Sequence, residues 1–405
     1  MKKSSVDLFR NRSSLCEVKG ARRTATFVNM QVHEDCTHRA TQNSHHAIGF
    51  EKGSRERLIK RKLQRSFDMK VSYIFIFLLG FILSFELTAQ EKSTIYLISS
   101  SSEYNEEVIP SIITMFKEKG HPVDTRYLDQ QVSDFGYVNT DKSRAKTLIN
   151  ALTDDNVKYL WFVRGGAGAL NLLPYLYAAE DKIKKSTPKI IVGFSDVTAI
   201  HYFINRQIKW PSVHGVLASF NKNLYVPNET KSEISRNSDV EDIFSLAEKE
   251  IKYRDVIPLN NQARKNIAGK LFGGNLTLLQ SLFSTKYETV SADDIFIVED
   301  VGVTYRQLDR SLHQLLYKNQ FKPKGIIFGQ FYSLSATDEE RLIFKTVIKD
   351  FAAKAPYPVY YYPLFGHGKT NKPLILFNDV KINCNKNDEY CSLTQKKMAL
   401  SNKSK

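Results

Sequence analysis

From about residue 93 onward, short and almost wholly apolar runs alternate with segments in which apolar residues recur at helical spacing. Runs of this kind predict buried strands, and the segments between them predict amphipathic helices. The first predicted strands are Thr94–Ser99, Pro122–Tyr127, Lys158–Val163 and Lys189–Phe194. Strands that alternate with helices indicate a parallel sheet covered by helices on both faces. We therefore predict an α/β domain over 90–245, with Asn221–Asp239 as a polar surface excursion or linker near its end.

A second block with the same alternation begins near residue 265. Gly269–Asn275 opens it and leads into a predicted helix through Leu282. Further strands are predicted at Asp294–Val298, Lys324–Phe328, Pro358–Tyr362 and Leu374–Phe377, with helices at Arg306–Lys318 and Glu339–Phe351. The pattern predicts a smaller α/β domain over 265–380, followed by a loose polar tail over 381–405.

The segment before these domains has the features of an export signal. Met69 and Lys70 precede the short apolar run Val71–Phe85, and the segment ends with Thr88 and Ala89. A positive start, a short apolar core and a small residue at the cleavage position are typical of a secretory signal peptide. We expect 69–89 to direct export to the periplasm or outside the cell. A membrane anchor with contact through 71–85 and a cytoplasmic location remain alternatives, and 1–68 is expected to be disordered or mis-assigned upstream sequence.

The charge of the chain excludes few classes of function. The net charge is +15, but about +8 of it lies in the first 89 residues, which leaves a mildly basic remainder. No zinc-finger spacing or basic helix supports nucleic-acid binding, so we predict no nucleic-acid partner.

Cys384 and Cys391 lie seven positions apart, and an oxidising compartment would permit a disulfide between them. Two free thiols are the alternative.

A serine follows the fourth predicted strand directly. In the sequence Gly193-Phe194-Ser195-Asp196, the serine stands at a strand-to-helix turn, where helix N–H groups can stabilise negative charge. Position 197 is Val, so the full nucleophile-elbow pattern with a second glycine is absent. A serine before a helix is also a common N-cap. Ser195 is therefore a candidate nucleophile only in combination with other groups.

Two further strand ends carry candidate groups. Arg164 and the glycine-rich stretch Gly165–Gly168 end the third strand, where backbone N–H groups can form an anion nest or a plain tight turn. Glu299 and Asp300 close the strand that begins at Asp294, a position where acids are either functional or structural salt-bridge partners. On or near the next helix, Asp309 and Arg310 either bind a substrate carboxylate or fix a contact between the domains.

The candidate base is a histidine between two glycines. His367 lies in Phe365-Gly366-His367-Gly368 after a predicted strand, where little packing holds its ring. His201, within a predicted helix, is expected to be a core or cap residue, whereas His214 is a rival for the role of base. Serine, glutamate and histidine thus follow in chain order, each near a strand end, which is the set of groups that acyl transfer needs.

At these residues the sequence resembles the LD-carboxypeptidase family of serine peptidases, which includes the microcin-immunity hydrolases. The resemblance spans roughly 93–380 and rests on several blocks in family order, far more specific together than any single one. The blocks are RGGAGALNLLPYL (Arg164–Leu176), PKIIVGFSDVTAIH (Pro188–His201), HG (His214-Gly215), LFGGNLTLL (Leu271–Leu279), IFIVEDVGVTYRQLDRSLHQL (Ile295–Leu315) and FGHG (Phe365–Gly368).

The resemblance implies a flavodoxin-like N-terminal domain, a smaller C-terminal domain and a Ser195–Glu299–His367 triad. The N–H groups of Gly166 and Asp196 would hold the oxyanion, and Arg164, Asp309 and Arg310 are candidates for substrate binding. The substrate implied is a murein tetrapeptide, from which the enzyme releases the terminal D-alanine. No metal and no cofactor are implied, and a homodimer is expected.

Two departures leave the substrate open. The family loop often has an aromatic residue where this chain has Ala167, and the family is mostly cytoplasmic, whereas 69–89 indicates export. Besides the murein carboxypeptidase, we consider an amide hydrolase of the microcin-immunity type that acts on a nucleotide-peptide. A non-catalytic module that binds a muropeptide is a third possibility. An α/β-hydrolase esterase is a weaker rival, because its second elbow glycine and HGGG-type loop are missing.

Overall fold

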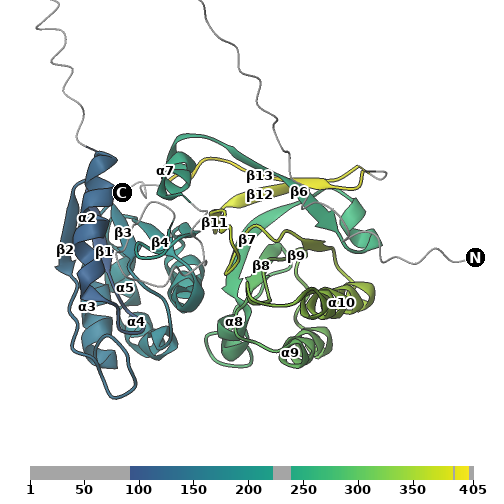
Figure 1. Cartoon of the computed structure of the whole chain (residues 1–405), viewed down its shortest axis with the longest axis horizontal. Coiled ribbons are helices and arrows are strands. Elements are labelled where there is room, and N and C mark those ends of the chain that lie inside the picture. The colour runs from purple at the N-terminus through teal and green to yellow at the C-terminus, as the bar shows by residue number, and fades with distance from the viewer. Residues whose placement is uncertain (1–91, 222–238, 386–387, 401–405) are drawn as a thin grey trace, which may run out of the picture. The chain divides into compact units, whose positions relative to one another are not determined.

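The computed structural model describes residues 92–221, 239–385 and 388–400. These residues belong to one compact unit, Leu87–Lys405, which contains an open sheet and a closed barrel (Figure 1). The segments 1–68 and 69–89, and most of the predicted linker Asn221–Asp239, lie outside the described residues. Among the described residues, no helix is both long enough and apolar enough to span a bilayer.

The open sheet has six strands in the order β11-β5-β4-β3-β1-β2. Strands β1 to β5 are all parallel and follow the 2-1-3-4-5 order of flavodoxin-like folds, which confirms the predicted fold class. The strands are β1 (Ile95–Ile98), β2 (Val123–Tyr127), β3 (Tyr159–Phe162), β4 (Ile190–Gly193), β5 (Ser212–His214) and β11 (Leu374–Leu376). The central strands are buried on both faces, as continuous apolar runs predict.

Helices cover the sheet on both faces. On one face, alternate strand residues such as Leu97 and Trp161 join a single core with Phe116 of α2 and Phe244 of α7. The intervening residues face the other helices. The helices of this half are α2 (Ile109–Glu118), α3 (Asp141–Thr153), α4 (Leu173–Ala178), α5 (Glu180–Lys184), α6 (Thr198–Phe203) and α7 (Val240–Glu248). Short 3₁₀ segments are η2 (Glu106–Val108), η3 (Ala169–Leu172) and η4 (Ser195–Val197), and a π-helical turn, η5 (Ile204–Ile208), continues α6.

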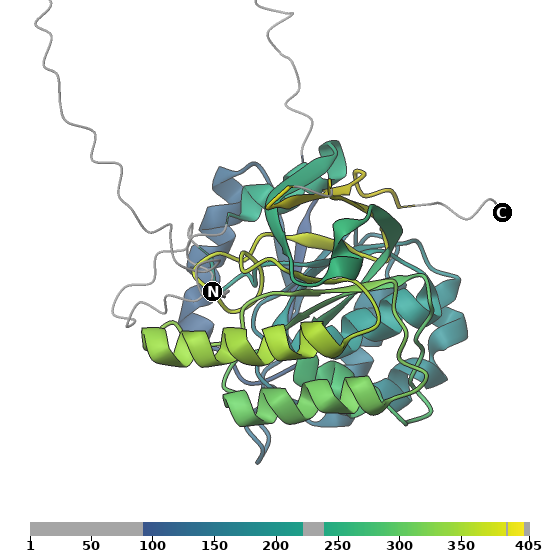
Figure 2. The ribbon, with the colours of Figure 1, turned by 90° about the vertical axis from the view of Figure 1, so that its right-hand side faces the viewer.

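The second half is a closed barrel of seven strands in the order β10-β6-β13-β12-β7-β8-β9. Parallel pairs β7–β8–β9–β10 alternate with helices, whereas β6, β12 and β13 pair antiparallel. The strands are β6 (Ile251–Pro258), β7 (Ile267–Asn275), β8 (Asp294–Glu299), β9 (Gly325–Phe328), β10 (Val359–Tyr361), β12 (Asp379–Asn383) and β13 (Cys391–Gln395). The helical segments are η6 (Asn261–Arg264), α8 (Leu276–Leu282), α9 (Tyr305–Tyr317) and α10 (Asp338–Lys354), of which α9 and α10 run side by side (Figure 2).

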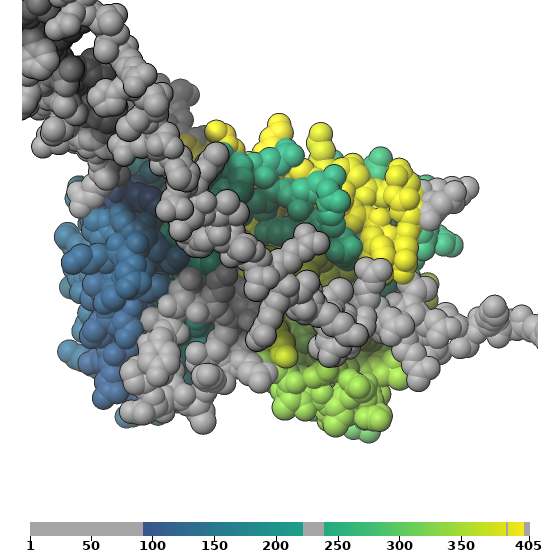
Figure 3. All heavy atoms as spheres, turned by 45° about the horizontal axis from the view of Figure 1, so that its top comes forward, coloured from purple at the N-terminus to yellow at the C-terminus, as the bar shows by residue number. Residues whose placement is uncertain are grey.

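The expectation of a loose tail over 381–405 is wrong for the residues that form β12 and β13. Both strands are paired within the barrel, and Figure 3 shows these yellow residues packed against the teal residues of β6. The physical reason is a two-residue alternation: Cys391, Leu393 and Gln395 point inward while their neighbours are less buried. Cys384 and Cys391 form a disulfide that joins the two strands.

The predicted boundaries of the second domain also need correction. β6 lies before residue 265 yet belongs to the barrel. β11 was expected in the C-terminal domain, but it pairs antiparallel with β5 and becomes the sixth strand of the first sheet. Ile375 of β11 joins the core of the first sheet, whereas Leu374 and Leu376 join the barrel core. This three-residue strand therefore contributes side chains to both hydrophobic cores.

Candidate active site

Ser195 lies at the sharp turn between β4 and α6. Its φ of 64° is in the left-handed region, which a non-glycine residue adopts at a cost of about 1–3 kcal/mol and mainly at functional positions. Gly193 makes the turn possible, because a Cβ there would lie 2.9 Å from the side chain of Val197. Val197 thus fills the space that a conventional elbow leaves to its second glycine.

The glycine-rich loop after β3 passes directly beside Ser195. A Cβ on Gly165 would come within 3.1 Å of the Ser195 Cβ, which is tighter than an ordinary contact, so glycine favours this close approach. Gly166 has a φ of 111°, and Ser102 Oγ accepts a hydrogen bond from the N–H of Ala167 at 3.1 Å. The loop is also tied to the turn itself, because a carboxylate oxygen of buried Asp196 accepts from the N–H of Ala169 at 2.9 Å.

Glu299 is the last residue of β8, and its side chain is completely buried. Its Oε2 lies 2.5 Å from Nδ1 of His367. Burial alone would raise the pKa of this carboxyl group, but His367 and His214 outweigh it and lower the pKa of Glu299 to about 2. Glu299 is therefore an ionised group inside the protein, held by imidazole on two sides.

His367 completes a hydrogen-bonded chain to the serine. Its Nε2 lies 3.1 Å from Oγ of Ser195, while its Nδ1 faces Glu299. Burial disfavours the charged ring, yet the charge of Glu299 and their hydrogen bond raise the pKa of His367 above its ordinary value. Gly366 permits this contact: its φ is 94°, and a Cβ there would lie 2.7 Å from Oε2 of Glu299.

Contacts between the sheet and the barrel fix the three side chains relative to one another. The Oγ1 of Thr198, three residues after Ser195, accepts a buried hydrogen bond from the N–H of Asn275 at 2.9 Å. A Cβ on Gly274 would lie 2.4 Å from the same Oγ1. Asn275 also donates to Asp300, the neighbour of Glu299. The ends of β4, β7 and β8 thus meet at one place.

The other two histidines have different positions. His201 is fully buried and its Nε2 contacts the carbonyl oxygen of Gly193 at 2.9 Å, in agreement with its expected structural role. Burial lowers the pKa of His201 to about 3. His214 does not contact Ser195 but lies on the far side of Glu299, with Nε2 3.8 Å from Oε1. Of the two rivals for the role of base, the one within hydrogen-bonding distance of the serine is His367.

Two models of protein families match this chain. The LD-carboxypeptidase N-terminal domain matches residues 95–215, and the LD-carboxypeptidase C-terminal domain matches residues 268–382. The chain belongs to the LD-carboxypeptidase family. These two matches cover the sheet and most of the barrel, including all three residues of the hydrogen-bonded chain.

Curated relatives of this chain agree with the assignment. A putative carboxypeptidase of Rickettsia conorii is 32% identical over 60% of this chain and 74% of the relative. The murein tetrapeptide carboxypeptidase of Pseudomonas aeruginosa is 26% identical over 68% of this chain and 88% of its own length. The family thus supports a serine peptidase with hydrolase activity.

Solved structures share the LD-carboxypeptidase fold. The muramoyltetrapeptide carboxypeptidase of Oxalobacter formigenes superposes with a TM-score of 0.62 at 20% identity, covering 75% of this chain and 98% of that one. The microcin self-immunity protein MccF in complex with aspartyl sulfamoyl adenosine gives a TM-score of 0.58 at 18% identity, covering 76% and 97%. At this level of identity the likeness establishes the fold.

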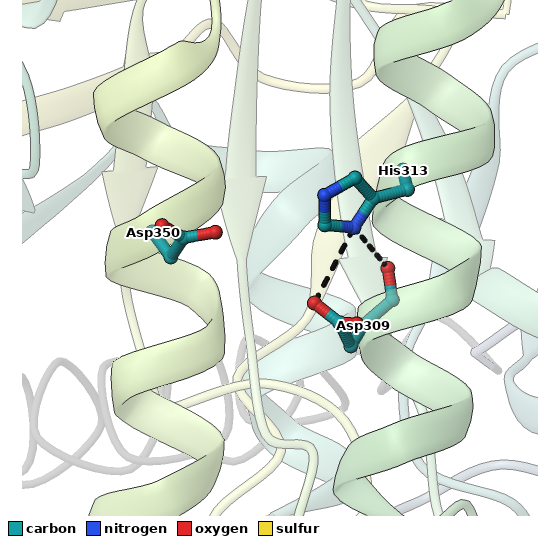
Figure 4. A group of neighbouring side chains, drawn as sticks. All are labelled: Asp309, His313 and Asp350. Carbon is teal, nitrogen blue, oxygen red and sulfur yellow. Dashed lines mark hydrogen bonds and ion pairs between the residues drawn. The ribbon is translucent and has the colours of Figure 1, made fainter.

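The three candidate substrate-binding residues lie in different surroundings. Arg164 directly precedes the loop beside Ser195, and its guanidinium donates to the carbonyl of Glu103 at 2.6 Å. Asp309 and Arg310 lie on α9, where Arg310 is exposed. Asp309 faces His313 one turn along, and Asp350 approaches from α10 (Figure 4). No hydrogen bond that the described residues make links Asp309 to Ser195, Glu299 or His367.

Two residues that support the site were not identified from the sequence. Ser102 contacts the glycine-rich loop, as described above, from the segment that follows β1. Arg144 of α3 is buried and donates to the carbonyl oxygens of Ser100 and Gly168, at 2.5 and 3.1 Å. For Ser102 the available signal was a run of four serines, Ser99–Ser102, after a predicted strand. Arg144 gave no signal, because an arginine in an amphipathic helix is usually exposed, whereas here it shares the buried face with Leu148 and Ala151.

Proposed function

We propose that this protein is a serine LD-carboxypeptidase that hydrolyses murein tetrapeptides and releases their terminal D-alanine. The observation that carries the proposal is the chain of contacts from Glu299 through His367 to Ser195, at 2.5 and 3.1 Å. Family membership supports peptidase chemistry, and the name of the Pseudomonas aeruginosa relative supports the tetrapeptide substrate.

The proposed first step is acylation of Ser195. Its Oγ attacks the carbonyl carbon of the bond to D-alanine while His367 Nε2 accepts the hydroxyl proton. Glu299 holds the tautomer with hydrogen on Nδ1 and stabilises the imidazolium that forms. The C–N bond then breaks, and His367 returns the proton to the amine of D-alanine, which leaves. Water attacks the acyl-enzyme in the same way, with His367 again as base.

The negative charge of the tetrahedral intermediate needs N–H donors. We assign this role to the N–H groups of Gly166 and Asp196. Asp196 lies in the first turn of η4, where helical N–H groups lack an intrahelical acceptor. Gly166 lies in the loop that passes beside Ser195. Removing one such donor typically lowers kcat by about 10²–10³.

Arg164 is the candidate for binding the terminal carboxylate. An arginine has five N–H donors in a planar fork, so one bond to Glu103 leaves capacity for a carboxylate. Its place next to Gly165 puts it beside the loop that flanks Ser195. Asp309 and Arg310 are less suitable, because Asp309 contacts His313 on the outer helix α9.

The decisive experiment is incubation of the purified protein with a murein tetrapeptide and quantification of free D-alanine. We expect release by the wild type, and loss of release in Ser195→Ala while the circular dichroism spectrum is unchanged. Activity on an aminoacyl-sulfamoyl adenosine without activity on the tetrapeptide would favour the amide-hydrolase alternative. Absence of covalent labelling of Ser195 by a fluorophosphonate would favour a non-catalytic muropeptide-binding module.

Export and assembly belong to the same proposal. Cleavage after Ala89 would place the enzyme where murein is exposed, and the family resemblance suggests a homodimer. N-terminal sequencing of the native protein tests the first point. Light scattering of the purified protein tests the second.

A further inference from the structure

His214 is a buried residue whose ring lies near the carboxylate of Glu299. It is the last residue of β5, its side chain is 0% exposed, and its ring lies between the rings of Phe194 and Phe365 at centroid distances of 5.8 and 5.9 Å. Among the described residues, neither ring nitrogen has a hydrogen-bond partner. The nearest ionic group is Oε1 of Glu299, 3.8 Å from Nε2.

Glu299 needs a donor on the side that His214 occupies. His367 takes Oε2, whereas Oε1 has no hydrogen-bond partner among the described residues. A buried carboxylate oxygen without a donor is costly, and electrostatic contacts are strong where water is excluded. If the His214 ring moved less than 1 Å toward Glu299, the 3.8 Å contact between Nε2 and Oε1 would become a charge-assisted hydrogen bond.

We propose that His214 is a positioning residue that presents Nε2–H to Oε1 of Glu299. In this role it keeps Glu299 ionised and turned so that Oε2 faces His367. The inference rests on the proposed function, because it assigns His214 a part in the same reaction. His214 touches neither Ser195 nor the place where the substrate would react, so it acts only through Glu299.

The surroundings of the pair contain few other ionisable groups. Asp300 follows Glu299 on β8 and is held by Asn275 and Thr277. His201, from α6, contacts the carbonyl of Gly193, the residue paired with His214 in the sheet. His367 contacts the opposite oxygen of Glu299. None of these three groups faces Oε1 of Glu299, whereas His214 does.

The test uses a readout that does not depend on the identity of the substrate. The rate at which a fluorophosphonate labels Ser195 is measured against pH for wild type, His214→Phe and His214→Gln. The Phe variant keeps an aromatic ring between Phe194 and Phe365 but removes the N–H, whereas the Gln variant keeps a donor. His201→Phe is the matched control, since it replaces another fully buried histidine of the same domain.

We expect the labelling rate of His214→Phe to fall about 10- to 100-fold, the effect of losing one hydrogen bond to a charged group. On the acid side of the pH profile, the midpoint of the labelling rate should move to higher pH in this variant. Glu299 would then interact with the His367 cation alone, which should raise the pKa of His367 further. His214→Gln should recover most of the rate and return the midpoint toward the wild-type value. The midpoint for His201→Phe should stay at the wild-type value.

A wild-type rate and midpoint in folded His214→Phe would overturn the inference. If that variant does not fold, His214→Leu and His214→Gln are compared instead, and equal midpoints for the two would overturn it. Failure of the proposed substrate is distinguishable, because wild-type protein would then label at Ser195 without releasing D-alanine. Absence of labelling in the wild type would indicate a non-catalytic module and would overturn the inference together with the proposed function. For the tetrapeptide reaction itself, His214→Phe should lower kcat and leave KM unchanged.

Discussion

Arg206 and Asp294 form a buried bidentate ion pair between the sheet and the barrel. The two guanidinium nitrogens lie 3.1 and 2.7 Å from the two carboxylate oxygens, and both side chains are less than a tenth exposed. The guanidinium also stacks on Phe272 of β7, 3.3 Å from the ring centroid. Because Arg206 follows Ser195 through α6 and Asp294 begins the strand that ends in Glu299, the pair helps to set the distance between nucleophile and acid.

Breaking this pair should destabilise the protein strongly. Asp294→Ala leaves a buried arginine without its counter-charge, and such changes cost about 3–5 kcal/mol of unfolding free energy. Urea denaturation followed by fluorescence measures the loss. The exposed pair Lys354–Asp350 supplies the control, since Lys354→Met should cost only about 0–1 kcal/mol. Similar losses in the two variants would contradict the prediction.

Gly366 should be intolerant of a side chain. Its φ of 94° disfavours other residues, and a Cβ would overlap with Glu299. Gly366→Ala should therefore lower kcat by displacing His367, in addition to a backbone strain cost of about 1–3 kcal/mol. Gly302→Ala is the matched control, because Gly302 also has a positive φ of 77° but has nothing within 4 Å of its Cβ position. Equal kcat values for the two variants would argue against close packing as the reason for Gly366.

The pH dependence of activity should follow His367. Burial opposes its charge, but Glu299 raises the pKa of His367 above its ordinary value of about 6.5. The base must be neutral to accept the serine proton, so kcat/KM should increase as pH rises through this elevated pKa. Glu299→Gln removes the charge, which should shift the acid limb to lower pH and reduce kcat by about 10⁴, as in the analogous serine-protease change. A profile measured from pH 5 to 9 checks both effects, and an unchanged limb in Glu299→Gln would refute the assignment.

The disulfide should stabilise the barrel without affecting catalysis. Cys384 and Cys391 are separated by seven positions, and closing so short a loop contributes about 2–3 kcal/mol on the chain-entropy model. The double variant Cys384→Ala/Cys391→Ala should therefore melt several degrees lower. Its kcat/KM should match that of the wild type, and calorimetry together with the D-alanine assay distinguishes the two effects. No change in melting temperature would mean that the β12–β13 pairing holds by itself.

Much of the local structure is predictable because burial imposes a period on the sequence. The predicted strands around Leu97, Trp161 and Val192 agree with β1, β3 and β4 within two residues at either end. Continuous apolar runs of this length fit only a strand covered on both faces. Each of Ser195, Glu299 and His367 could be placed near a strand end from the sequence, but β4 belongs to the open sheet and β8 and β10 belong to the barrel. The meeting of the three side chains was therefore expected from the family resemblance and not from a shared sheet edge.

The parts that were missed depend on contacts between residues distant in sequence. Nothing local in Leu374–Leu376 reveals that β11 pairs with β5 rather than with a barrel strand. The weak alternation in Cys391–Gln395 was overlooked in a segment of polar composition. Asp309 illustrates the same limit on a helix, since the spacing of Leu308, Leu312 and Leu315 identifies the buried face but not which partner the neighbouring side chains meet.

The placement of β11 constrains the order in which the molecule can be completed. β5 remains an open edge until residues 374–376 have been made, after the barrel strands β6 to β10. An unpaired edge strand invites pairing with other chains, and contacts so far apart in sequence slow folding. The nascent first sheet thus stays vulnerable to association while the barrel is being made. Each half matures only with the other, so neither is expected to survive as a separately expressed fragment.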